Sequence, residues 1–558
     1  MPDTWAATDA LGRTVPVAGQ VRGPGRNKTV AIFYFLWMEP RARGGLYDIS
    51  KLLKENPANP KFGPPHAFHW WGEPRFGYYT SDDEWVIRKH AQMLSDAGVD
   101  VVVFDVTNAF TYDETYLAVC RVFERIRSEG GRAPQIAFIA NSHPAPTVQK
   151  LYDRFYSKGL HEDLWFRWLG KPLLLSPFEG LNPAITNFFT QRHSWAWTKG
   201  HNWFGDGRDK WPWLDNHPQT PGWHESPDKP EHISVCVAQH PTSNIGRSFH
   251  DGKEPPPGQR APERGICFAE QWRRALEVDP PFVFVTGWNE WIAQRFISEK
   301  GGQTFLGKPL PPGGTFFVDQ YNQEFSRDIE PMRGGHGDNY YYQLVDNIRR
   351  YKGARPLPGP SAPRTIRVSG DFDQWREVGP EYLDDLGDTA RRNHPGYAAL
   401  HDTPYINNSG RNDLEAMKVA RDGTNLYFYV RAREPLNPRS GSTNWMVLLL
   451  DTDHNPTNGW NGFDFIINHT IRDAATTAVA KCSGGWNWEP VAEARYADGG
   501  NELQLAIPRA VLGLDPAQGP IKLAFKWADN IPNSGDILDF LDHGDVAPNG
   551  RFKYRFEE

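Results

Sequence analysis

The sequence predicts a (β/α)8 TIM barrel followed by an antiparallel β-sandwich. At 558 residues the chain is too long for one ordinary hydrophobic core. Short apolar runs alternate with helical patterns up to residue 352, and shorter alternating strands follow residue 364. Between them, 353-GARPLPGPSAP-363 is too rich in proline and glycine to continue a helix or a central strand. We therefore predict a barrel domain at 1–352, a linker at 353–363 and a second domain at 364–558.

Eight apolar runs in the first domain are candidate barrel strands. Near-continuous apolar runs are typical of parallel strands that are covered on both faces. One intervening helix has clear ends, because Ser81 to Glu84 form a capping box and Gly98 supplies a stop. A last helix is expected at 339–350. The predicted strands are 30–37, 99–105, 135–141, 172–176, 194–198, 233–239, 282–289 and 315–319.

The second domain has the pattern of an all-β fold. Short strands of alternating polarity are separated by turn sequences such as Asp422-Gly423. The predicted strands are 365–368, 416–421, 426–431, 445–451, 463–468, 502–507 and 523–527.

Composition narrows the range of partners. The net charge is −7, without long runs of one sign, so no nucleic acid or anionic membrane surface is expected as a partner. No run approaches the ~18 apolar residues of a membrane span. The four cysteines lack metal-binding spacing, and the N-terminus lacks the features of a signal peptide. We expect a secreted or periplasmic protein whose signal peptide is absent from this sequence; the oligomeric state stays open.

Polar and aromatic side chains follow most of the predicted barrel strands, at the rim where barrel enzymes bind and convert substrates. Asp105 and Glu290 directly end the two most apolar runs, which makes them the candidate catalytic pair. Aromatic rings stack on the apolar faces of sugars, so the high aromatic content favours a carbohydrate ligand. The candidate substrate-binding residues are Trp37, His69, Trp70, Asn108, His143, His240, Trp288, Asn289 and Trp291.

The stretch 282-FVFVTGWNEWIAQ-294 places Glu290 between two tryptophans. Burial against aromatic rings raises the pKa of a carboxyl group and suits it to acid or base catalysis. Hydrolysis of a glycoside needs a second carboxylate, for which Asp105 is the best placed. The insertion at 40–80 contains 66-HAFHWWGEPRFGYY-79, which we expect to form an aromatic wall beside this pair.

The segments FYFLWM, FHWWGEP, VVVFDVTN and GWNEW resemble glycoside hydrolase family 99, whose members are endo-acting α-mannosidases and α-mannanases on a (β/α)8 barrel. The resemblance implies that Glu290 acts as the base on a sugar 2-hydroxyl. The family's acid position is Ala293 here, followed by Gln294. Either another rim carboxylate supplies the acid or the chemistry differs, and mannose specificity is not implied. The candidate carboxylates are Asp105, Glu39, Asp319 and Glu324.

The second domain resembles carbohydrate-binding module family 9 in 365-TIRVSGDFDQWREV-378, 422-DGTNLYFYVRARE-434 and 450-LDTDHNPTNGWNGFDF-465. Asp451, Asp453 and Asn455 alternate on a turn, as oxygen ligands of a structural Ca²⁺ do. The alternative is a hydrogen-bonded turn without metal. Trp486 and Trp488 would either stack on a glycan or fill the core.

These observations predict a glycoside hydrolase that acts on a poly- or oligosaccharide and needs no cofactor for catalysis. Retaining and inverting mechanisms both stay open. Two alternatives remain. The loss of an acid at Ala293 favours a non-catalytic glycan-binding protein, and the histidines at 69, 143 and 240 with Arg295 keep a polysaccharide lyase open.

Overall fold

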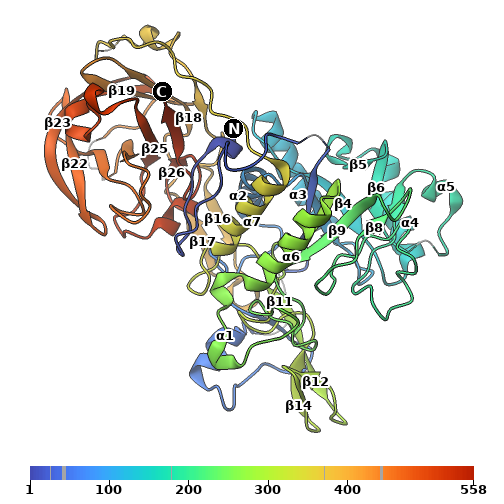
Figure 1. The fold of residues 1–558 in the computed structure, drawn as a ribbon. Helices are drawn as coiled ribbons and strands as arrows, with labels where there is room; N and C mark the ends of the chain where they lie inside the picture. Colours follow the sequence, from blue (N-terminus) through green and yellow to red (C-terminus); the bar gives the residue numbers. More distant parts are fainter. Residues whose placement is uncertain (26, 40–44, 178, 370, 440–443) are drawn as a thin grey trace.

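The protein is a mixed α/β structure with a curled, mostly parallel sheet and a separate antiparallel-sheet domain (Figure 1). The computed structural model describes residues 1–558 except 26, 40–44, 178, 370 and 440–443, so the start of the 40–80 insertion lies outside the described residues. The chain termini lie near each other at the junction of the two parts, where Ala6 bridges to Lys553. None of the helices in the described part of the chain has the length and apolar character needed to cross a membrane.

The parallel sheet has the strand order β5-β6-β4-β3-β1-β10-β9-β8, with β7 paired to β6. Its strands form because both faces are covered. On β1, Val30, Ile32 and Tyr34 belong to the core on one face, and Ala31 and Phe33 belong to the core on the other. The parallel strands are β1 (Thr29–Tyr34), β3 (Val101–Asp105), β4 (Gln135–Ile139), β6 (Lys171–Leu175), β7 (Thr190–Arg192), β9 (Pro230–Cys236) and β10 (Phe282–Thr286). Antiparallel edges are added by β5 (Arg167–Trp168) and β8 (Gly222–Trp223).

The predicted barrel is confirmed only as this curled sheet. The strand expected at 194–198 is replaced by β7 at Thr190–Arg192. Beyond β7, the wall towards β9 consists of isolated bridges such as Ala196 to Leu214. The strand expected at 315–319 is wrong as a barrel strand, because β14 (Gly314–Phe317) pairs antiparallel with β11 (Ile292–Ser298) outside the sheet. Two glycines after two prolines favour such a hairpin over a buried strand.

The insertion and the segment after β10 together form a small second sheet. The order is β14-β11-β2, with β2 at Phe68–Trp70, so the aromatic insertion is held against the chain that follows Glu290. A short hairpin, β12 (Thr304–Phe305) with β13 (Lys308–Pro309), lies next to it.

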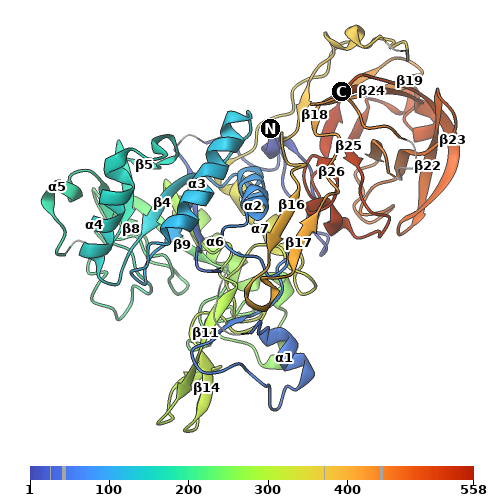
Figure 2. The ribbon, with the colours of Figure 1, turned by 180° about the vertical axis from the view of Figure 1, so that it is seen from behind.

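Helices cover the parallel sheet between its strands (Figure 2). In α2, the Asp83 side chain accepts from the N–H groups of Trp85 and Val86, and Gly98 caps the other end in the left-handed conformation. The predicted helix start is thus confirmed within a few residues. The α-helices are α1 (Ile49–Glu55), α2 (Glu84–Ala97), α3 (Asp113–Ser128), α4 (Pro144–Arg154), α5 (Pro183–Thr186), α6 (Ile266–Val278) and α7 (Asn339–Lys352). Short 3₁₀ helices are at Pro2–Thr4, Tyr156–Lys158, Glu162–Leu164, Pro257–Gln259, Pro262–Arg264, Asp373–Trp375, Ala398–Leu400, Arg509–Leu512, Pro516–Gln518 and Ile537–Leu541.

The second domain forms one eleven-stranded antiparallel sheet in place of the two separate sheets of the expected sandwich. The order is β15-β18-β19-β24-β23-β22-β21-β20-β25-β26, with β27 paired to β25. Its strands are β15 (Tyr382–Leu383), β18 (Leu414–Arg421), β19 (Asn425–Ala432), β20 (Val447–Asp451), β21 (Phe465–Ile471), β22 (Thr476–Gly484), β23 (Asn487–Gly499), β24 (Glu502–Pro508), β25 (Lys522–Asp529), β26 (Asp545–Ala547) and β27 (Tyr554–Glu557). The strand expected at 365–368 is extended chain without strand pairing.

A separate hairpin of the second domain, β16 (Arg392–Pro395) with β17 (Pro404–Asn407), runs beside α2 (Figure 2). Arg392 pairs with Asp83 at the start of α2, with 2.8 Å between Nη2 and Oδ2. The Tyr397 N–H donates to the Tyr78 carbonyl at 2.8 Å, so the hairpin is fixed to the rim of the first domain.

Candidate functional site

A cavity of about 630 Å³ lies at the edge where the parallel strands end. Its lining combines segments that follow β1 and β3 with the insertion, β11 and one residue of the second domain. Aromatic rings and two carboxylates, Glu39 and Asp319, dominate this lining. The residues are Trp37, Glu39, His66, Phe68, Asn108, Phe110, Tyr112, Ile292, Ala293, Gln294, Phe296, Val318, Asp319 and Tyr397.

Asp319 lies two residues after β14, and 38% of its side chain is exposed. Its Oδ1 is 3.8 Å from Arg327 Nη2 and 3.8 Å from His240 Nε2. The surrounding protein raises the pKa of Asp319 by desolvation, which Arg327 opposes. Asp319 is therefore a carboxyl group that a ligand can reach and that holds its proton more firmly than an ordinary aspartate.

Glu290 lies behind Asp319 and is 2% exposed. Its Oε2 accepts from Gln320 Nε2 at 2.7 Å and from the Arg327 guanidinium, whose Nε is 3.1 Å away. Every hydrogen bond to this carboxylate from the described residues ends on Oε2, so Oε1 has no protein donor there. Burial raises the pKa of Glu290 well above its usual value despite Arg327, and the charges of Asp319 and Asp328 raise it further.

Asp105 ends β3 and is 5% exposed. The Thr107 N–H donates to its Oδ1 at 2.9 Å. Burial raises the pKa of Asp105 to about 6; Thr107 opposes this and Asp319 adds to it. Asp105 also raises the pKa of Tyr112, which lines the cavity with Asp319, so Asp105 lies close to both. Asp105, Asp319 and Glu290 thus form one electrostatically coupled set around Arg327.

Replacing Asp105 with asparagine should stabilise the protein at neutral pH. The folded pKa of about 6 exceeds the ordinary 3.8, so the folded state loses stability as pH rises through this window. Asparagine keeps the Oδ1 acceptor and removes the ionisation. We expect the variant to be more stable than wild type by about 2–3 kcal/mol at pH 7 and by much less near pH 4, measured by urea unfolding. An equal difference at both pH values would contradict this account.

The structure brings together some of the predicted substrate residues. Trp37 and Asn108 line the cavity, where Asn108 Nδ2 donates to the Tyr112 hydroxyl at 2.7 Å. His240 borders Asp319, and burial lowers its pKa well below the usual value, which keeps it neutral. His143 is exposed at the start of α4 and is not part of the cavity lining.

Five other predicted substrate residues lie behind the cavity wall, in the protein interior. They are at most 1% exposed and do not line the cavity: His69, Trp70, Trp288, Asn289 and Trp291. The Asn289 side chain is occupied by Phe35, because its Oδ1 accepts from the Phe35 N–H and its Nδ2 donates to the Phe35 carbonyl. His69 accepts from the Gly63 N–H and contacts the Ala67 carbonyl. This placement corrects the expectation that these side chains contact a ligand directly.

The tryptophans around Glu290 have a structural part in the site. Trp291 stacks on Trp71 with 4.6 Å between ring centroids, and its Nε1 donates to Glu330 at 2.5 Å. Trp71 Nε1 donates to Asp328, whose carboxylate also accepts from the Glu290 N–H. The two rings therefore fix the loop that holds Glu290.

Sequence reasoning missed part of the cavity wall, including Tyr112 and Tyr397. His66 and Phe68 lie in the aromatic insertion, which was expected to form a wall, but Tyr112 directly precedes α3 and Tyr397 comes from the second domain. A residue so distant in sequence gives no local pattern. Glu324, a candidate acid, lies outside the lining and accepts from the N–H and hydroxyl of Ser248.

The predicted calcium turn is well supplied with protein donors. Lys553 Nζ is 2.9 Å from Asp451 Oδ2, and the His454 N–H donates to Asp451 Oδ1 at 2.7 Å. Asp453 Oδ1 accepts from the Asn455 N–H, and Asn455 Oδ1 accepts from Thr457. A Ca²⁺ bound by Asp451, Asp453 and Asn455 stays a prediction; these contacts match the alternative of a hydrogen-bonded turn.

The fold and the cavity define a class: a mixed α/β protein with an acidic, aromatic-walled cleft at the carboxyl edge of a curled parallel sheet. No protein-family model and no curated protein match the chain. Two solved structures of the GH99 endo-α-mannosidase from Bacteroides thetaiotaomicron, one in complex with BIS-TRIS propane, match at 13% and 14% identity. They cover 58% and 59% of this chain and 97% and 98% of theirs, both at TM-score 0.33.

A third solved structure, a glycoside hydrolase-like protein, matches at 11% identity over 60% of this chain and 97% of its own, at TM-score 0.32. These TM-scores are too low to establish a shared fold, and no residue role is transferred from these proteins. Nothing among the matches supports the expected likeness of 364–558 to carbohydrate-binding module family 9.

Proposed function

We propose that the protein is a glycoside hydrolase that cleaves a poly- or oligosaccharide with the carboxyl groups Asp319, Asp105 and Glu290. The observation that carries this proposal is their arrangement. Asp319 lines an aromatic-walled cleft and is open to a ligand. Asp105 and Glu290 are buried outside the lining, and the charge of Asp319 raises the pKa of both. Mutual repulsion and burial keep a proton within the set near neutral pH, as a general acid requires.

Asp319 supplies the carboxyl group that the sequence lacks at Ala293. In the β11–β14 ladder, Arg295 is opposite Phe317 and Phe296 is opposite Phe316. Asp319 lies two residues beyond the end of β14, Ala293 lies two residues before Arg295 on β11, and both line the cleft. We assign Asp319 as the acid that protonates the glycosidic oxygen, with Glu290 and Asp105 as the base or nucleophile behind it.

The substrate is a glycan chain that extends beyond one sugar ring. Trp37, Phe68 and Tyr112 offer ring faces for stacking on pyranose rings. The cleft shares Glu39 and Tyr112 with a neighbouring cavity of about 760 Å³, lined also by His394 and His401 of the second domain. Two adjoining cavities suit a chain bound on both sides of the cleaved bond. We further propose that the curled sheet, with its seven parallel strands among the described residues, is an incomplete (β/α)8 barrel whose wall between β7 and β9 is irregular.

A specific observation favours a second candidate, a glycan-binding protein without catalysis. Glu290 is held by a buried ion pair to Arg327, and a carboxylate fixed in this way is a common structural element. In that case the aromatic cleft would still bind a glycan, and the acids would only position its walls.

Glu290→Gln separates the two candidates. Glutamine keeps the shape and the contact with Gln320 but loses the charge and the proton. We expect wild type to release reducing sugar from at least one polysaccharide of a panel, and Glu290→Gln to be slower by about 10²-fold or more with a similar KM.

The control is Glu299→Gln, an exposed acid beyond the end of β11, which should keep full activity. Equal rates for Glu290→Gln and wild type would remove Glu290 from the mechanism. Glycan binding without product release, measured by calorimetry, would favour the binding protein.

A further inference from the structure

Three groups of acidic side chains in the second domain, one of them with a histidine, have the spacing of a metal site. In each group, three residues offer ligand atoms that all lie within 4.8 Å of one another. Such clusters are common without a metal, so the hydrogen-bond partners of the oxygens decide between them. The groups, among the described residues, are Asp539, Asp542 and His543; Asp451, Asp453 and Asp464; and Asp384, Asp388 and Asp545.

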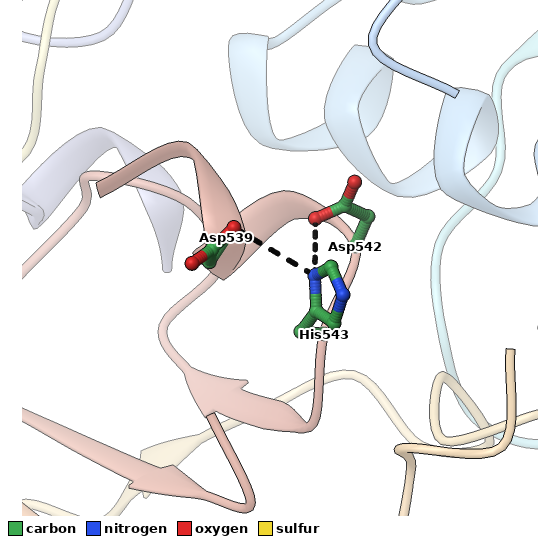
Figure 3. A group of neighbouring side chains, drawn as sticks. All are labelled: Asp539, Asp542 and His543. Atoms are coloured by element: carbon green, nitrogen blue, oxygen red, sulfur yellow. Dashed lines mark hydrogen bonds and ion pairs between the residues drawn. The ribbon is translucent and has the colours of Figure 1, made fainter. Parts of the chain in front are cut away.

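The first group is neutralised by the protein. Figure 3 shows His543 turned towards Asp542 and Asp539, with 2.8 Å between His543 Nδ1 and Asp542 Oδ1. Arg75 of the first domain binds Asp542 with two nitrogens, at 2.9 and 2.8 Å, and Asp539 at 2.9 Å. The Arg75 guanidinium therefore neutralises these acids in the position that a metal ion would have.

The second group is also largely satisfied. Besides the Lys553 ammonium on Asp451, Asp464 Oδ2 accepts from the N–H and hydroxyl of Thr452 at 2.8 and 3.0 Å. A buried lysine and local donors leave little need for a metal ion here.

The third group is different, because its oxygens lack donors. Both carboxylate oxygens of Asp384, Oδ1 of Asp388 and Oδ1 of Asp545 are buried without a hydrogen-bond partner among the described residues. Asp388 and Asp545 are 4% and 2% exposed. Buried carboxylate oxygens left without a donor or a cation are strongly unfavourable, so this group either holds protons or binds a cation.

The surrounding charges bear on this choice. Asp385 and Asp413 lie close enough to feel the charge of Asp388, and they in turn face the cations Arg132, Arg88 and Arg433. The cations that face the three carboxylates themselves are Lys89 of α2, 3.8 Å from Asp388 Oδ2, and Lys526, whose ammonium donates to the Pro548 carbonyl. Neither makes a hydrogen bond to the unpartnered oxygens.

We propose that Asp384, Asp388 and Asp545 bind a divalent cation, Ca²⁺, with the unpartnered carboxylate oxygens as ligands. Three carboxylates supply a hard, all-oxygen ligand set that Ca²⁺ prefers, and water or backbone carbonyls complete it. Asp384 and Asp388 follow β15, whereas Asp545 begins β26. The ion therefore ties the start of the second domain to its C-terminal strands, next to α2 of the first domain. This site is separate from the cleft and does not depend on the proposed function.

The test uses the full chain, freed of metal with a chelator and titrated with CaCl₂. We expect one binding event in calorimetry and a melting temperature that rises by about 5 °C or more at saturation. In the double variant Asp384→Asn/Asp388→Asn the affinity should fall by at least about 100-fold. The metal-free variant should melt at or above metal-free wild type, since mutual repulsion is removed.

The matched control is Asp451→Asn, which should keep the calcium response. Loss of binding in Asp451→Asn but not in the double variant would show that the ion binds at Asp451, Asp453 and Asp464, and would overturn the proposal. If the double variant does not fold, hydrogen exchange of wild type with and without CaCl₂ replaces it, and protection should appear at 383–388 and 545–547. No response to CaCl₂ in wild type would also overturn the proposal.

Discussion

Replacing Asp319 with asparagine should reduce kcat for glycan cleavage by about 10²–10⁴-fold, the usual contribution of a positioned general acid. Asp319 is the carboxyl group of the coupled set that lies open in the cleft, and asparagine keeps its size while removing its proton. Binding should change little, because the aromatic wall is untouched. Steady-state kinetics on the best polysaccharide of the panel measure both parameters.

The pH profile gives a second readout of the same variant. Burial raises the pKa of Asp319, so its acid form persists to higher pH than in an ordinary aspartate, and the wild-type rate should fall as pH rises through that raised pKa. Asp319→Asn should lose this alkaline limb. For comparison, Glu39→Gln alters an exposed acid of the same cleft and should affect KM more than kcat. A wild-type kcat in the Asp319→Asn variant would contradict the assignment of Asp319 as the general acid.

The sequence predicted the parts of the fold that depend on local pattern. Runs such as Phe282 to Thr286 are apolar on both faces, so they could only be buried parallel strands, and the structure places them there. The cap of α2 and its glycine stop are equally local. The prediction of the last barrel strand was wrong because an apolar run such as 315-TFFV-318 fits either a barrel strand or a hairpin. The strand it pairs with decides between these two structures. β23 was missed because it is mostly exposed and contains Pro490.

The sequence predicted where the site lies better than it predicted which side chains line it. Asp105 and Glu290 were found because they end apolar runs in the sequence; in the structure Asp105 ends β3 and Glu290 lies four residues after β10. Asp319 stood among several rim acids, and its exposed place in the cleft lining beside Arg327 distinguishes it. The tryptophans beside Glu290 were interpreted as ligand contacts, but their ring nitrogens donate to buried acids or point into the core. Sequence gives the residue type, whereas side-chain direction depends on packing across the whole fold.

Replacing Arg75 with methionine should give the largest loss of stability. Arg75 is 5% exposed and joins the first domain to Asp542, Asp539 and Asp536 of the second. Burial raises the pKa of Asp542, but hydrogen bonds from His543 and Arg75 outweigh this and hold it below its usual value. Methionine has similar volume and leaves these acids without their main cation. Removing one partner of a buried ion pair costs about 3–5 kcal/mol, to be measured by urea unfolding at pH 7.

The same substitution should also change how the two domains unfold. A carboxylate with a lowered pKa contributes stability above its ordinary pKa and loses it as pH falls through the folded value, so the wild-type advantage should shrink in acid. With the ionic link of Arg75 to three acids broken, calorimetry at pH 7 should resolve two transitions where wild type shows one more cooperative transition. Arg376→Met is the matched control, because that ion pair with Asp373 is exposed and should contribute no measurable stability. If Arg75→Met and Arg376→Met unfold alike, the interdomain cluster does not stabilise the protein. Other interdomain contacts, such as those of Arg392, Arg551 and Trp5, then hold the two domains together.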